Sequence, residues 1–232
     1  MSGREADNSF KARARAFVPS LPNALVEGVL RLMSFFDHVP GRLREQNRRE
    51  NDDIWVEKYS RTYAESFIED QALLKDLKLG KSDMAYAGCE IIAVYNALLD
   101  RKKLEETLPG LISCFEKKGV VLNGRFGTAP RALARYLRSI GIGAEYSIRR
   151  KDFPLLAERS AVFIVTAYND YADIMQEIHT VCITKEPDGR FRAHNSRKCR
   201  ESVEGFDALE QALGVGGRGK ILAMTGIIEK GE

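Results

Sequence analysis

The most informative segment of the chain reads Gly88-Cys89-Glu90-Ile91-Ile92-Ala93-Val94-Tyr95-Asn96-Ala97-Leu98-Leu99. Its apolar residues fall on every side of a helix, which predicts a central, buried helix from Cys89 to about Lys103. A thiol in the first turn lies at the positive end of the helix dipole, which favours the thiolate. Because the thiolate is the nucleophilic form of cysteine, Cys89 is a candidate nucleophile. The alternative is a cysteine that only fills the core, as many cysteines do.

Upstream, the sequence predicts a helical extension over residues 1–80. Residues 1 to about 20 are polar and indicate a flexible arm, and residues 22–37 carry apolar side chains at helical spacing. One or two further helices are expected to reach about Leu79, where Gly80 is a plausible stop, with a loop before Cys89. Such an extension could cover a cleft, form a structural lobe or bind a partner.

Downstream, the pattern changes from helices to strands near Gly143. Helices are expected over 104–118 and 129–139, the second with Thr128 as its N-cap. Helices first and strands second predict an α+β domain over 81–232, in which the Cys-bearing helix packs on an antiparallel sheet. The expected strands are 144–148, 161–167, 179–185, 190–194 and 221–228, with short helices at 154–158 and 206–213.

A hairpin relates a histidine to an asparagine. The strands 179–185 and 190–194 flank a Pro-Asp-Gly turn. If that turn has three residues, with Gly189 left-handed, Asn195 lies on the same face as His179 and diagonal to it, about 7–8 Å away at the backbone. A two-residue turn would move Asn195 to the other face.

These three residues form a candidate catalytic set. Cys89 would attack a carbonyl, His179 would hold the proton and return it to the leaving group, and Asn195 would orient the imidazole. Taken singly, these residues have structural alternatives: Cys89 could simply fill the core, and Asn195 could simply end a strand.

The order of these motifs resembles the papain-like cysteine peptidase clan, and most closely its bacterial double-glycine leader peptidases. The resemblance rests on Gly88-Cys89-Glu90, on Gly127-Thr128 before a helix, and on the hairpin with His179 and Asn195, over roughly residues 80–230. It implies a papain-like fold and a thiol hydrolase that cleaves a peptide or related amide bond through an acyl-enzyme on Cys89, without a cofactor. An acyltransferase with the same residues, or a non-catalytic papain-fold binding module, remains open.

One position departs from that family. It usually places a glutamine about six residues before the cysteine to donate to the oxyanion, and here that residue is Asp83. An ionised carboxylate cannot donate a hydrogen bond. The backbone N–H of Cys89 and the side chains of Ser82 and Tyr86 are the remaining candidate donors.

Other motifs are weaker. A zinc site on His179 and Cys182 is disfavoured because these residues point to opposite faces of a strand. The glycine-rich run 214–220 has the spacing of a phosphate-binding loop, but Ile221 stands where Ser or Thr would bind magnesium, so a turn is expected.

Composition bounds the remaining possibilities. A net charge of +3 with 30% charged residues gives no reason to expect a nucleic-acid partner. Residues 21–39 are too polar to span a membrane, and no signal peptide is visible. Four unpatterned cysteines suit a reducing compartment. We therefore expect a cytoplasmic protein with a peptide or protein substrate, and the sequence gives no oligomeric state.

Overall fold

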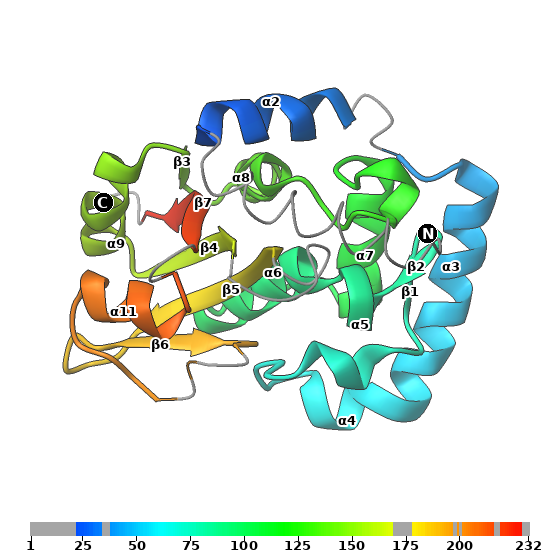
Figure 1. Ribbon diagram of the computed structural model, residues 1–232. Coiled ribbons are helices and arrows are strands. Elements are labelled where there is room, and N and C mark those ends of the chain that lie inside the picture. Colours follow the sequence, from blue (N-terminus) through cyan, green and yellow to red (C-terminus); the bar gives the residue numbers. More distant parts are fainter. Residues whose placement is uncertain are drawn as a thin grey trace, which may run out of the picture.

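A computed structural model describes residues 22–33, 38–168, 178–196, 199, 201–215 and 219–228. The arm predicted for residues 1 to about 20 lies outside these ranges. The chain forms an antiparallel five-stranded sheet in the order β3-β7-β4-β5-β6, with helices around it (Figure 1). The mixed α+β class predicted from the sequence is therefore confirmed.

The predicted strands are present within one or two residues of their expected bounds. Alternating or continuously apolar runs over this part of the chain mark them, as expected for buried strands. The strands are β3 (Ala144–Ser147), β4 (Val162–Tyr168), β5 (Ile178–Lys185), β6 (Phe191–His194) and β7 (Lys220–Ile227).

The five helices predicted from the cysteine onward are present, and the largest difference is the start of the second one, at Leu108 instead of residue 104. Thr107 caps one of them by accepting a hydrogen bond from the N–H of Gly110, and a proline follows within its first turn. These helices are α6 (Cys89–Asp100), α7 (Leu108–Lys117), α8 (Pro130–Ser139), α9 (Phe153–Arg159) and α11 (Phe206–Ala212). Thr128 is not the N-cap of α8, because Ala129 occupies that position without a side-chain hydrogen bond.

The segment before α6 differs most from its prediction. Its helices are α2 (Asn23–Met33), α3 (Gly41–Ile54) and α4 (Ser60–Tyr63), and a π-helical turn, η3 (Trp55–Tyr59), joins the last two. A 3-10 turn, η4 (Gln71–Leu74), and a small hairpin of β1 (Lys78–Leu79) and β2 (Ser82–Asp83) follow, so the helix does not continue to Leu79. The expected loop before Cys89 contains β2 and the short helix α5 (Met84–Ala87).

The main sheet separates two hydrophobic clusters. Even-numbered residues of the central strands, such as Ile164 and Cys182, join the larger cluster with α6, α7 and α8. Odd-numbered residues, such as Val165 and Val181, join the smaller cluster with α9 and α11. Both faces of the central strands are therefore covered, and the alternation of β4 and β5 decides which side chains reach α6.

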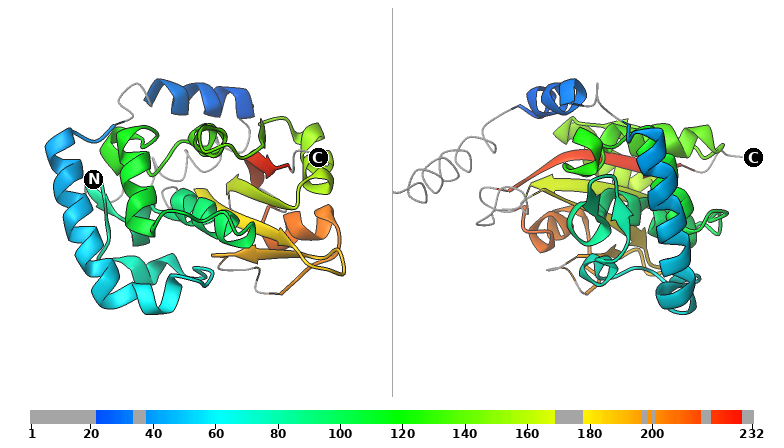
Figure 2. Two further views of the ribbon diagram at one scale, coloured as in Figure 1. Left: turned by 180° about the vertical axis from the view of Figure 1, so that it is seen from behind. Right: turned by 90° about the vertical axis from the view of Figure 1, so that its right-hand side faces the viewer.

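The larger cluster extends across position 80, where the sequence predicts a domain boundary. Trp55, Ile68 and Leu77 belong to it together with residues of α6 and α7. The view from behind shows α3 along the edge of the described part of the chain opposite α9 and α11 (Figure 2, left). Residues on both sides of position 80 thus share one core.

The hairpin of β5 and β6 has the three-residue turn. The backbone N–H of Glu186 donates a hydrogen bond to the carbonyl oxygen of Arg190 at 2.8 Å, which closes the turn. Gly189 is left-handed, with a φ of +84°. Cys182 pairs with His194, so the next pair along the ladder would be Val181 and Asn195. This register is the one that the sequence analysis requires for His179 and Asn195 to be diagonal neighbours.

Candidate active site

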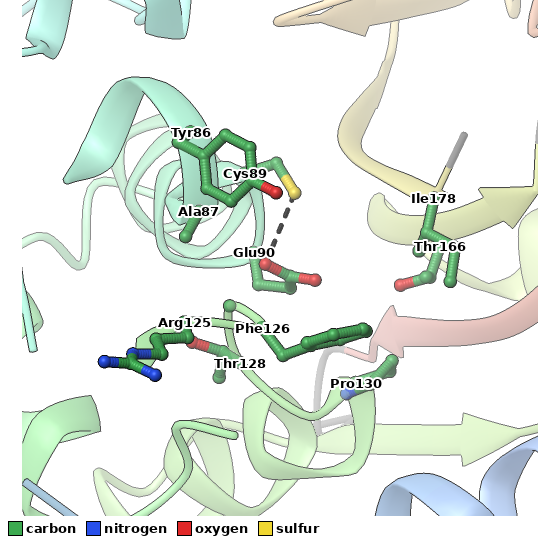
Figure 3. Close-up of a pocket in the computed structure, with 11 residues that line it drawn as sticks. Tyr86, Ala87, Cys89, Glu90, Arg125, Phe126, Thr128, Pro130, Thr166 and Ile178 are labelled. Carbon is green, nitrogen blue, oxygen red and sulfur yellow. Dashed lines mark hydrogen bonds between the residues drawn. The ribbon is translucent and has the colours of Figure 1, made fainter. Parts of the chain in front are cut away.

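A pocket opens at the N-terminal end of α6, beside the predicted nucleophile (Figure 3). Its cavity volume is about 60 Å³, which is well below that of a typical small-molecule site. Aromatic and aliphatic side chains make up most of its wall, and a thiol, a carboxyl group, a guanidinium group and hydroxyl groups provide the polar part. The lining residues are Tyr86, Ala87, Cys89, Glu90, Arg125, Phe126, Gly127, Thr128, Pro130, Thr166 and Ile178.

Cys89 meets a carboxyl group in this pocket. Its side chain is 7% exposed, and its Sγ donates a hydrogen bond to Oε2 of Glu90 at 3.3 Å. Burial, and secondly the charge of Glu90, raise the pKa of the Cys89 thiol well above its ordinary value, although hydrogen bonds from Thr180 oppose this. At neutral pH the resting side chain is therefore a thiol, contrary to the expectation from the helix dipole alone.

Glu90 is the most perturbed acid of the site. It is 6% exposed, and burial raises its pKa to about 7, although hydrogen bonds from Cys89, Thr180 and the backbone of Thr128 favour the carboxylate. Gly127 lies directly against it with a φ of +67°, and a Cβ there would be 3.0 Å from Oε2 of Glu90. A carboxyl group with a pKa near 7 can both accept and donate a proton at neutral pH.

Three threonines surround the thiol and the carboxyl group. The Thr180 hydroxyl donates to Oε1 of Glu90 at 3.5 Å, and it shares a 2.9 Å hydrogen bond with the hydroxyl of Thr166 on the neighbouring strand. Thr128 is 2% exposed, and its Oγ1 has no hydrogen-bond partner among the described residues. The site therefore holds one buried hydroxyl with unused bonding capacity.

His179 contacts Asn195, the third residue of the candidate set. It pairs with Ala167 in β4, and Nε2 of its imidazole is 2.6 Å from the backbone carbonyl oxygen of Asn195. The next residue on β5, Thr180, reaches Glu90 through its hydroxyl and gives Cys89 a hydrogen bond from its backbone.

Asn195 is a connector between distant segments. Its backbone is left-handed, with a φ of +60°. Its side-chain Oδ1 accepts a hydrogen bond from the backbone N–H of Gln71, and its Nδ2 donates one to Oε1 of Gln71, each at 3.0 Å. Gln71 in turn donates from Nε2 to the carbonyl of Ala85 in α5. Asn195 thus contacts His179 through its backbone and holds Gln71 through its side chain.

Asp83, at the position where the resembled family has glutamine, has a local structural role. Its Oδ1 accepts the backbone N–H of Tyr86 at 2.9 Å and so caps α5. Tyr86 follows on that helix, and its half-exposed ring lines the pocket. The carboxylate of Asp83 is therefore explained by the start of α5.

A second polar network, centred on His194, escaped the sequence analysis. Its Nδ1 is 2.8 Å from Glu69, its Nε2 is 3.0 Å from the Thr184 hydroxyl, and the ring of Phe67 stacks on it at 3.9 Å. Burial disfavours the ionised form of Glu69, but hydrogen bonds from His194 and Asn195 outweigh it and lower the pKa of Glu69. His194 is 2% exposed and does not line the pocket, so this network fixes the segment of Phe67 and Glu69 to the sheet.

Searches for other kinds of site gave little within the part of the chain that the structure describes. There, no group of three or more His, Cys, Asp or Glu residues is placed to hold a metal ion. No helix in the described ranges has the length and hydropathy needed to cross a membrane.

Comparison with known proteins adds no relative: no family model, curated protein or solved structure matches this chain.

Proposed function

We propose that the chain is a thiol-dependent acyl-transfer enzyme that cleaves a peptide or related amide bond through an acyl-enzyme on Cys89. The observation that carries the proposal is the 3.3 Å hydrogen bond from Sγ of Cys89 to Oε2 of Glu90 in the wall of a pocket. A nucleophile within hydrogen-bond distance of a base is the arrangement that covalent catalysis requires. A buried carboxyl group with a pKa of about 7 is suited to be that base.

The reaction balances with these two side chains. Sγ attacks the acyl carbon while the thiol proton passes to the carboxylate of Glu90, and the carbonyl oxygen becomes an oxyanion. When the tetrahedral intermediate collapses, the bond to the leaving amine breaks and protonated Glu90 returns the proton to the amine nitrogen. Water, activated by the same carboxylate, then hydrolyses the thioester. An amine in place of water would make the enzyme an acyltransferase.

This proposal changes the papain-like assignment at one residue. A helix-borne cysteine beside an antiparallel sheet supports the resemblance, and the proposal assigns the proton of the thiol to Glu90, whose carboxyl group contacts it, in place of His179. The thiol starts neutral and is deprotonated during attack, as the hydroxyl of a serine hydrolase is. No preformed thiolate–imidazolium pair is needed.

A binding module is the second candidate function. The specific observation in its favour is the burial of Cys89 beside the carboxyl group of Glu90, which raises the pKa of the thiol and disfavours the nucleophilic thiolate. In that case the pocket would hold a ligand without reaction, and Cys89 would act only as part of its wall.

Acylation by 4-nitrophenyl acetate separates the two candidates. We expect a burst of 4-nitrophenol and an acetyl group on Cys89, seen by peptide mass spectrometry, with a rate that increases with pH through about 7 as Glu90 loses its proton. Glu90→Gln should slow acylation about 100- to 10,000-fold, the usual contribution of a general base. Cys114→Ser removes an exposed thiol and serves as the control. Absence of acylation at Cys89 in the native chain would support the binding module.

A further inference from the structure

An unpaired buried hydroxyl group in the pocket calls for an explanation. Three buried side-chain oxygens have no hydrogen-bond partner within the described residues: Oε2 of Glu116, Oγ1 of Thr128 and Oγ of Ser160. Of these three residues, Thr128 alone lines the pocket beside Cys89 and Glu90. Leaving a buried hydroxyl unpaired costs about 1–3 kcal/mol, so such groups are rare in folded proteins and are often functional.

Local structure does not use this hydroxyl. A threonine directly before a helix commonly caps it, and the sequence predicts that role for Thr128. Instead, α8 begins one residue later, with Ala129 at the N-cap and Pro130 as the first helical residue. The hydroxyl of Thr128 is therefore neither a cap nor part of the hydrogen-bond network of Thr166 and Thr180.

The position of Thr128 is fixed relative to the reacting groups. Its backbone pairs with Val120 in an isolated β-bridge and also gives Glu90 a hydrogen bond. The adjacent Gly127 is in close contact with the Glu90 carboxyl group and with the Ala87 carbonyl. The segment that carries the hydroxyl and the helix that carries Cys89 and Glu90 thus form opposite parts of one pocket wall (Figure 3).

We infer that the Thr128 hydroxyl donates the hydrogen bond that binds the acyl oxygen of the substrate and stabilises the oxyanion formed on attack by Cys89. This inference rests on the proposed function. Asp83 cannot supply such a donor, because its carboxylate is an acceptor that caps α5. The hydroxyl oxygen is buried in the resting pocket, so the inference requires Thr128 to turn about its Cα–Cβ bond and present the hydroxyl to the substrate oxygen. Hydrogen-bond donors to an oxyanion contribute most in sites from which water is excluded.

Two reactions of the same thiol test the role of Thr128. Acylation by 4-nitrophenyl acetate passes through an oxyanion, whereas alkylation by iodoacetamide is a displacement at carbon that forms none. We expect Thr128→Val, which keeps the shape of the side chain and removes the hydroxyl, to slow acylation of Cys89 about 100- to 1,000-fold. Alkylation of Cys89 should change less than about threefold, and Thr128→Ser should restore acylation to within about tenfold of the native rate.

The outcomes separate this inference from the proposed function. If the native chain acylates Cys89 and Thr128→Val acylates equally fast, the role of Thr128 is refuted while the acyl-enzyme stands. Equal slowing of acylation and alkylation would also refute it, because a changed pocket shape would then explain both. If the native chain does not acylate Cys89 although iodoacetamide reaches the thiol, the proposed function fails.

Discussion

At the scale of single residues, the site is defined by a conflict between burial and charge at Glu90. The carboxyl group is 6% exposed in a helix whose other residues are almost all apolar. Burial disfavours its ionised form, whereas the surrounding hydrogen bonds favour that form, and the balance raises its pKa to about 7. The form that accepts a proton from Cys89 is therefore the form that the fold tolerates least.

This conflict predicts how stability depends on pH. The folded chain keeps the Glu90 proton at pH values where the unfolded chain, with an ordinary pKa of 4.5, has lost it. Its contribution to the free energy of unfolding is therefore complete below about pH 4.5 and is lost as the pH rises through about 7. We expect a decrease of up to roughly 3 kcal/mol, from about 1.4 kcal/mol for each pKa unit.

Urea unfolding at pH 5 and pH 8, in the native chain and in Glu90→Gln, measures this effect. Glutamine does not titrate, so the difference between the two proteins isolates Glu90 from every other acid. We expect the native chain to lose more stability than the variant between the two pH values. Parallel pH profiles would show that Glu90 has the same pKa in the folded and unfolded chains.

At the scale of elements, β5 supplies the side chains that meet the N-terminal end of α6. Ile178 lines the pocket, Thr180 reaches Glu90, and His179 between them contacts Asn195. The proposed mechanism assigns the thiol proton to Glu90, so His179 and Glu90 should differ in their effect on acylation.

Replacing the histidine tests this consequence. His179→Ala should leave the rate and the pH dependence of Cys89 acylation within about threefold of the native values, whereas Glu90→Gln should reduce the rate by at least about 100-fold. Both variants are measured with 4-nitrophenyl acetate, after their folding has been checked by circular dichroism. A loss of more than tenfold in folded His179→Ala would restore the histidine as the catalytic base.

The sequence predicted the secondary-structure elements better than it predicted which face of a strand packs against which helix. Strand periodicity predicted β5 and β6 but left two registers open, and the three-residue turn with a left-handed Gly189 decides between them. Which face of β5 meets α6 was not predictable, because apolar side chains line both faces and alternation gives no sign of inside and outside. Glu90 was missed because an acid in the first turn of a helix usually reflects the helix dipole. The available signal was that Glu90 belongs to a helix that is apolar on every side, which indicates that its carboxyl group is buried.

At the scale of the whole molecule, the segment from Val39 to Gly80 is joined to the rest by buried polar contacts. Asn96 bonds both backbone groups of Ile68, at 2.9 and 3.0 Å, and Glu116 accepts the N–H of Gly80 at 2.6 Å. Three residues after Ile68, Gln71 is held by Asn195 through two further bonds. Because Gln71 also bonds α5, which carries Tyr86, this segment positions one wall of the pocket.

Truncation tests whether this segment is a separable extension or part of the core. Removal of residues 1–80 would expose the apolar surface that Trp55, Ile68 and Leu77 cover, and would leave the buried side chains of Asn96 and Glu116 without their partners. Each such unpaired group costs about 1–3 kcal/mol, a large part of the 5–15 kcal/mol by which domains are usually stable. We therefore expect the 81–232 fragment to be insoluble or to lack a cooperative unfolding transition.

Removal of residues 1–37 is the matched control. It deletes α2, whose described polar contacts are those of Asn23 with the carbonyls of Ile148 and Ile221 and of Glu27 with the Tyr146 hydroxyl. The contacts of residues 39–80 with α6, α7 and the hairpin remain in that fragment. We expect it to unfold cooperatively in urea and to acylate Cys89 at the native rate. If the 81–232 fragment did the same, residues 1–80 would be an independent extension, and the pocket would owe its shape to the C-terminal part alone.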